Sequence, residues 1–132
     1  MHELINYYDY NGYTVIDILS EELSLHQVSR IAKSNNLELE RLNFPNVIID
    51  ITKLNYIDTS GLGFIANMKR FLSKYGNDVA VICINDYILH LMHLTKIETL
   101  VKIVSSLDEA VEYLNNRKKT IPLNEVNISK TF

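Results

Sequence analysis

Two adjacent hydroxyl groups lie in the stretch Asp58-Thr59-Ser60-Gly61, between a β-branched segment and a segment with helical spacing. A strand that turns directly into a helix leaves the first amides of that helix exposed beyond the sheet. Thr59 or Ser60 could accept a hydrogen bond from one of these amides, and Gly61 and Gly63 leave room for another molecule to approach. We expect one of these hydroxyls to be exposed and to be chemically modified by another molecule. The alternative is a plain helix cap with no further role.

Other residues give little support for catalysis, a metal site or a cofactor. His90 and His93 are three residues apart, but no carboxylate or thiolate is placed convincingly beside them, and metal sites usually need three or four ligands. Cys83 lies in an apolar segment, where a buried thiol is normally inert. No phosphate-loop lysine follows the glycines, and the sequence around Ser60 lacks the nucleophile-elbow pattern. The sequence predicts a non-enzyme with no catalytic residues, no metal and no cofactor.

The composition is typical of one soluble domain, with 132 residues, 47% hydrophobic and 22% charged. Because the sequence shows no signal peptide, no run of about 20 apolar residues and only one cysteine, we expect a cytoplasmic protein without membrane insertion. Residues 1–115 hold nine Lys or Arg and fifteen Asp or Glu, a net charge of −6, whereas residues 116–132 carry a net +3. An acidic body argues against direct nucleic-acid binding, and the basic cluster Arg117-Lys118-Lys119 is interpreted as a solvated run.

The elements around the turn follow from apolar spacing and turn residues. Asn11-Gly12 between two strand-like runs is a strong hairpin signal, and the β-branched run from Val47 to Ile51 has the composition of a strand buried on both faces. We predict an α/β domain over residues 1–115 and a flexible tail over residues 116–132. The domain has a mostly parallel sheet of about five strands, an N-terminal antiparallel hairpin and about four helices. The expected strands are 4–10, 13–19, 46–52, 79–84 and 100–104, and the expected helices begin near residues 21, 61, 87 and 107.

The motif Asp58-Thr59-Ser60-Gly61-Leu62-Gly63, at mid-chain after Val47-Ile48-Ile49-Asp50, resembles the signature of the STAS domain family. From about residue 4 to 115 the chain is similar to bacterial anti-sigma factor antagonists, also called anti-anti-sigma factors. The apolar strand 79–84, the segment from Leu91 to Ile97 and the segment from Leu107 to Val111 support the same resemblance.

This resemblance implies a phosphorylation switch that regulates transcription through protein–protein interaction. An unphosphorylated antagonist binds an anti-sigma factor that is also a serine/threonine kinase, and thereby frees a sigma factor. Carried over by position, Thr59 is the phosphorylated residue; phosphorylation releases the antagonist, and a protein phosphatase resets it. Asp58 matches the family's acidic neighbour and Ser60 its second hydroxyl. With Gly61 and Leu62 they are expected to shape the partner-binding surface.

Two positions depart from the family pattern. The family often carries Gly-Glu-Leu-Asp between the second strand and the first helix, where this chain has Glu21-Glu22-Leu23-Ser24. That loop lies at the partner surface in family members, so Glu22, Leu23 and Ser24 are also predicted to bind the partner. Because two of the four residues differ from the family pattern, we expect either an unusual partner or a weaker contact with the kinase. The acceptor is threonine rather than the commoner serine, and its methyl group restricts χ1. The alternative function is a STAS scaffold subunit of a larger signalling or transport complex, without a phosphate cycle.

Overall fold

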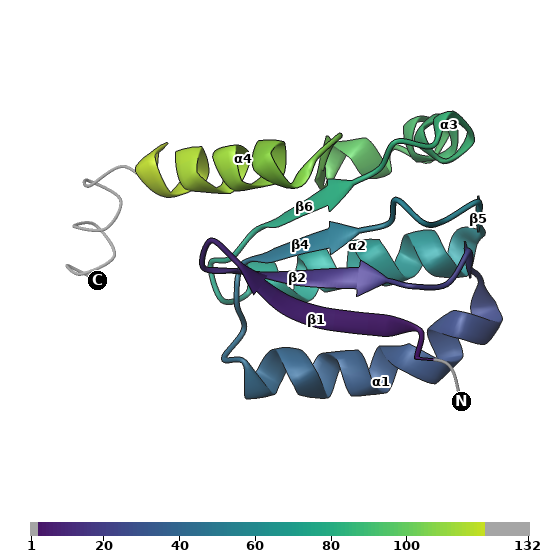
Figure 1. Ribbon diagram of the computed structural model, residues 1–132, viewed down its shortest axis with the longest axis horizontal. Helices are drawn as coiled ribbons and strands as arrows, with labels where there is room; N and C mark the ends of the chain where they lie inside the picture. Colours follow the sequence, from purple (N-terminus) through teal and green to yellow (C-terminus); the bar gives the residue numbers. More distant parts are fainter. Residues whose placement is uncertain (1–2, 121–132) are drawn as a thin grey trace.

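A five-stranded sheet lies between two layers of helices (Figure 1). The computed structural model describes residues 3–120, with side chains to residue 117. The strand order is β1-β2-β4-β6-β7; β1 pairs antiparallel with β2, and the other neighbours are parallel. These features confirm the predicted fold class. The strands are β1 Ile5–Tyr10, β2 Tyr13–Ile18, β4 Val47–Asp50, β6 Val79–Ile82 and β7 Lys102–Val104.

The predicted hairpin turn is present at the end of β1. Asn11 has φ 53° and Gly12 has φ 87°, the left-handed conformations that a two-residue turn between twisted strands requires. The pairing starts at Tyr10 opposite Tyr13 and continues to Ile5 opposite Ile18. The turn residues therefore fix the register of the antiparallel edge.

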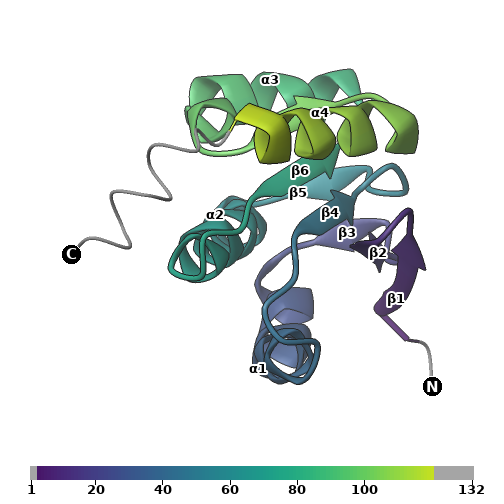
Figure 2. The ribbon, with the colours of Figure 1, turned by 90° about the vertical axis from the view of Figure 1, so that its left-hand side faces the viewer.

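Four α-helices cover the sheet. Figures 1 and 2 show α1 and α2 together on one face and α4 on the opposite face. The helix α4 continues to Thr120, five residues past the predicted domain end at residue 115, and the rest of the predicted tail lies outside the described residues. The helices are α1 Leu25–Arg41, α2 Thr59–Ser73, α3 Asp86–Leu94 and α4 Leu107–Thr120, with a 3-10 turn η1 at Ile97–Thr99.

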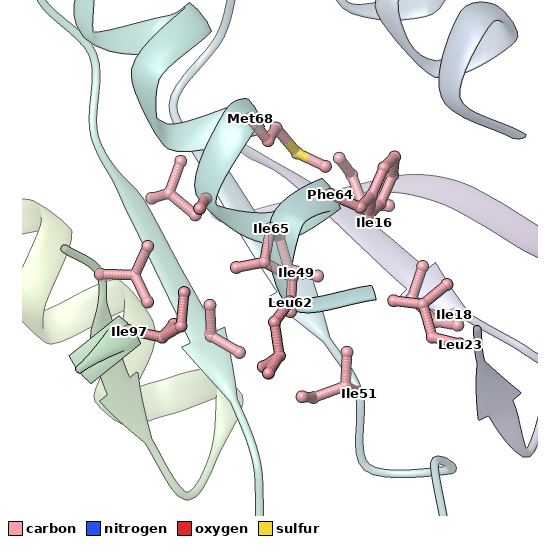
Figure 3. Close-up of a cluster of buried hydrophobic side chains, with 14 of the residues drawn as sticks. Ile16, Ile18, Leu23, Ile49, Ile51, Leu62, Phe64, Ile65, Met68 and Ile97 are labelled. Carbon is pink, nitrogen blue, oxygen red and sulfur yellow. The ribbon is translucent and has the colours of Figure 1, made fainter. Parts of the chain in front are cut away.

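The strand β4 is buried on both faces, as its β-branched composition predicts. Val47 and Ile49 belong to the core cluster under α1 and α2, and Ile48 belongs to the second cluster, under α4. Figure 3 shows Ile49 meeting Leu62 and Ile65 of α2 in the first of these clusters. This packing fixes α2, and with it the start of α2, against the centre of the sheet.

A second, two-stranded sheet was not predicted. Glu22–Leu23 (β3) pairs in parallel with Tyr56–Ile57 (β5), at the end of the molecule where the parallel strands finish. The predicted helix start at residues 21–24 is wrong, because α1 begins at Leu25. Strands of two residues are too short to show periodicity. The pairing brings the loop before α1 next to the turn before α2.

Asp78 links three elements at the opposite end of the sheet. Its carboxylate accepts hydrogen bonds from Lys69 Nζ of α2 at 2.5 Å, and from Tyr113 Oη and Arg117 Nε of α4 at 2.9 and 3.0 Å. The N–H of Val79 also donates to it at 2.7 Å. Burial alone would raise the pKa of Asp78, but the hydrogen bonds from Lys69, Val79 and Tyr113 outweigh it, and the pKa is lowered.

We expect Asp78→Asn to lower the free energy of unfolding by about 1–2 kcal/mol at pH 7. A carboxyl group with a lowered folded pKa stabilises the fold above its unfolded pKa of about 3.9, and this stabilisation is lost as the pH falls through the folded value. Urea titrations at pH 7 and below pH 4 should show the gap between variant and wild type shrinking in acid. A difference in unfolding free energy that is as large in acid as at pH 7 would contradict the lowered pKa of Asp78. Asp9→Asn, at an exposed carboxylate, is the control.

Candidate functional site

One carboxylate joins the starts of two helices. Asp58 is the N-cap of α2, and its Oδ1 accepts from the N–H groups of Ser60 at 2.9 Å and Gly61 at 3.1 Å. Its Oδ2 accepts from the N–H of Leu25, the first residue of α1, at 3.2 Å. The predicted cap at Thr59 or Ser60 is wrong: the Asp58 carboxylate accepts from the first-turn amides, and among the described residues no hydrogen bond engages either hydroxyl.

Thr59 is the first residue of α2 and is exposed. Among residues 3–117, no hydrogen bond engages its hydroxyl. Ser60 is half-buried and faces a groove between α1 and α2. The hydroxyl of Thr59 therefore combines solvent access with a backbone that Asp58 holds rigidly in place.

Three residues predicted to contact a partner are buried. Leu23 is 0% exposed and Leu62 is 5% exposed; both belong to the core, as Figure 3 shows. Gly61 packs against the neighbouring sheet, because a Cβ placed there would lie 2.1 Å from the carbonyl oxygen of Leu23 and 2.6 Å from Cγ1 of Ile57. The side chains of Leu23 and Leu62 offer no surface to a partner, and Gly61, which has no side chain, is itself buried. These residues position the turn, which corrects the prediction that they shape the contact surface themselves.

The loop before α1 has one exposed and one structural residue. Glu22 is exposed and is paired with Tyr56 in the small sheet. Ser24 is the N-cap of α1; its N–H and its Oγ both donate to Gln27 Oε1, at 3.0 and 2.6 Å. A serine at this position, where the family often has aspartate, therefore keeps a helix-capping role.

The structure brings Glu22, Leu25, Tyr56 and Thr59 together, and we call these four exposed residues the acceptor face. Leu25 and Tyr56 are 64% and 46% exposed, which is high for large apolar side chains. The hydrogen bond from the Leu25 N–H to the Asp58 carboxylate and the pairing of Glu22 with Tyr56 hold them in one region. Sequence reasoning missed Leu25 and Tyr56, because an apolar residue within a helix or strand pattern gives no sign that it faces solvent.

The sequence pattern of the STAS domain family matches residues 5–110 of this chain. The chain belongs to the STAS domain family. STAS domains of this kind are non-enzymatic regulatory domains, in agreement with the prediction of a non-enzyme.

Relatives of this STAS domain are similar along most of their length. A Thermotoga neapolitana protein, named as an anti-sigma factor antagonist and homolog of TM1081, is 23% identical over 103 residues, covering 78% of this chain and 91% of that protein. The structure of an anti-sigma factor antagonist from Mycobacterium paratuberculosis superposes with a TM-score of 0.74 at 18% identity, covering 84% of this chain and 92% of that one.

SpoIIAA, a further anti-sigma factor antagonist, has been solved in two forms that resemble this fold. The unphosphorylated form has a TM-score of 0.63 at 16% identity and covers 89% of this chain and 99% of its own. The phosphorylated form from Bacillus has a TM-score of 0.62 at 15% identity, covering 83% and 97%. At these identities the likeness establishes the fold.

The remaining candidate residues of the STAS domain have structural explanations. Among the described residues, no group of three or more His, Cys, Asp or Glu side chains could hold a metal ion. His93 Nδ1 lies 2.6 Å from Glu98 Oε1 at an exposed position. Cys83 is buried, and this burial raises the pKa of its thiol. Within the part of the chain that the structure describes, no helix is both long and apolar enough to span a bilayer.

We expect Asp58→Ala to lower the free energy of unfolding by about 2 kcal/mol, because three N–H groups at two helix starts lose their acceptor. Asp58→Asn retains one carbonyl oxygen for Ser60 and Gly61 but cannot accept from Leu25 through its amide nitrogen, and it should lose about half as much. Urea-induced unfolding followed by circular dichroism measures both. An Asp58→Ala variant as stable as the wild type would show that Asp58 does not cap.

Proposed function

We propose that this STAS domain is a cytoplasmic anti-sigma factor antagonist whose binding is switched by phosphorylation of Thr59. In the unphosphorylated state the acceptor face binds an anti-sigma factor with serine/threonine kinase activity and so frees a sigma factor. Phosphorylation of Thr59 by that kinase releases the complex, and a protein phosphatase restores the hydroxyl. The names of the relatives and the two phosphorylation states of SpoIIAA support this proposal.

The observation that carries the proposal is the exposed hydroxyl of Thr59 on a turn fixed by Asp58. A phosphoryl acceptor must be reachable by another protein's active site, and its backbone must be held in a reproducible position. Thr59 meets both requirements. It is flanked on the acceptor face by the exposed apolar side chains of Leu25 and Tyr56, which suit a protein partner.

The position of Asp58 determines what a phosphate at Thr59 would do. The N–H groups of Ser60 and Gly61 already donate to Asp58, and that of Leu62 donates to its carbonyl oxygen. A phosphate on Thr59 would therefore stay in solvent instead of replacing the cap. It would add about −1.5 to −2 charges to the surface where a partner docks, beside a carboxylate that already carries one. We therefore expect the phosphate to weaken partner binding while the domain stays folded.

The test is phosphorylation by the purified cognate anti-sigma factor with ATP, followed by mass mapping of the modified residue. We expect one phosphate on Thr59, none on Thr59→Ala, and unchanged incorporation in Ser60→Ala. No incorporation by an active kinase, or incorporation that persists in Thr59→Ala, would reject the acceptor assignment. A stable large assembly formed without any phosphate cycle would instead support the scaffold function.

A further inference from the structure

A groove of about 500 Å³ runs between α1 and α2. These two helices lie on the face of the sheet away from α4 (Figure 2). Its walls are apolar side chains from both helices, including Val28 and Ala32 of α1 and Phe64, Met68 and Phe71 of α2. The residues that line it include asparagines and a serine but no charged residue. A volume of this size falls within the range of about 300–1,000 Å³ that small-molecule sites occupy.

One polar group in a residue that lines this groove has no hydrogen-bond partner among the described residues. Asn35 of α1 lines the groove and is 1% exposed. Its Oδ1 accepts a hydrogen bond from Tyr7 Oη of β1 at 2.5 Å, whereas its Nδ2 is buried without a hydrogen-bond partner among the described residues. The large majority of buried side-chain polar atoms are hydrogen-bonded, so this unpaired donor is the polar group that a ligand in the groove would engage once the amide turns toward it.

We propose that the groove binds an uncharged small molecule with an apolar body and a carboxamide or similar amide group. The apolar walls bury the body, and the absence of charge in the lining disfavours an ionised ligand, whose desolvation nothing would offset. The terminal torsion of asparagine is broad, so the Asn35 amide can turn toward the groove. An amide on the ligand offers both an acceptor and a donor, and therefore complements Asn35 whichever way its own amide is oriented.

Gly63 provides a way to close the groove without disturbing the fold. It lies on α2 in the groove lining, and a Cβ built there would meet no atom within 4 Å. Because Gly63 lines the groove and the space around it is open, a leucine side chain at this position can extend into the groove. Gly63→Leu should therefore fill the site while keeping or increasing helix stability, since glycine is a poor helix former.

Octanamide is a suitable probe because it is neutral and joins a seven-carbon alkyl chain to a primary amide. We expect saturable shifts of the backbone amide signals of α1 and α2 in heteronuclear NMR, with a Kd of about 1 mM or tighter for its ten non-hydrogen atoms. Gly63→Leu should bind at least about tenfold more weakly, with a urea midpoint no lower than that of wild type. Octanoate, which has the same chain length and a negative charge, should also bind at least about tenfold more weakly.

Each outcome decides part of the proposal. Absence of saturable octanamide binding at 5 mM, about five times the expected Kd, would overturn it. Undiminished binding to the folded Gly63→Leu variant would place the ligand elsewhere and would also overturn it. Equal affinity for octanoate would overturn the uncharged class of ligand. None of these readouts depends on a kinase or on Thr59. A failure of the ligand proposal would therefore not count against the proposed phosphorylation switch, and the reverse also holds.

Discussion

Replacing Gly61 with alanine is expected to lower the free energy of unfolding by about 2–4 kcal/mol, the largest stability change predicted for this chain. The added Cβ would lie 2.1 Å from the carbonyl oxygen of Leu23 and 2.6 Å from Cγ1 of Ile57. Neither neighbour can yield easily. The Leu23 carbonyl belongs to a strand paired with β5, and the Ile57 side chain is 2% exposed in the core. The start of α2 would have to move away from the small sheet.

Gly63→Ala is the matched control for this experiment. Both glycines lie in the first turns of α2, and neither has a positive φ, so the intrinsic helix preference of alanine applies equally to both. A Cβ at Gly63 meets open space, and alanine there should raise the free energy of unfolding by about 0.5–1 kcal/mol. Chemical denaturation of the two variants, analysed with a common m-value, measures the difference. Similar stability of both would show that the close approach at Gly61 is not required.

Phosphorylation of Thr59 is expected to weaken binding to the anti-sigma factor about 100-fold. Two added charges at about 6 Å from an acidic partner group, in a medium of dielectric about 40, oppose binding by about 3 kcal/mol. Thr59→Asp adds a single charge and should weaken binding about tenfold. Its stability should stay within about 0.5 kcal/mol of wild type, because Thr59 is exposed and the start of a helix tolerates a carboxylate.

Thr59→Asn separates charge from shape in this measurement. Asparagine has nearly the size of aspartate but no charge, so it should bind the partner within about twofold of wild type. Titration calorimetry of the wild-type, Asn, Asp and phosphorylated proteins should give affinities in the order that the charges predict, with smaller differences at high salt. An Asn variant as weak as the Asp variant would mean that the hydroxyl itself is recognised and that electrostatic ejection is not the mechanism.

Much of this architecture could be predicted because single residue types dictated it. Asn11-Gly12 permits little besides a tight hairpin, and the β-branched run at Val47 fits only a strand covered on both sides. The small sheet was missed, since Glu22–Leu23 and Tyr56–Ile57 acquire strand geometry only by meeting each other. The mid-helix Asn35 did not end α1 because burial and the Tyr7 hydroxyl override its local preference.

The motif at residues 58–61 could be singled out from the sequence, but the helix cap within it was assigned to the wrong residues. Asp, Ser and Thr are all favoured at helix N-caps, so the motif alone could not show that Asp58 is the cap and that the hydroxyls are uncommitted. The requirement for glycine at position 61 likewise comes from the Leu23 carbonyl, which lies 38 positions earlier in the chain. Distances of this kind through space leave no trace in the spacing of residues along the sequence.

The backbone around Thr59 takes its form from two segments that are distant in sequence. Leu25, which donates to Asp58, is 33 residues away from it, and Leu23 supplies the carbonyl oxygen against which Gly61 packs. A synthetic peptide spanning residues 54–66 contains neither residue and cannot reproduce the geometry of the turn. An enzyme that modifies Thr59 would have to read tertiary structure instead of a linear consensus, so phosphorylation would report that the domain has folded.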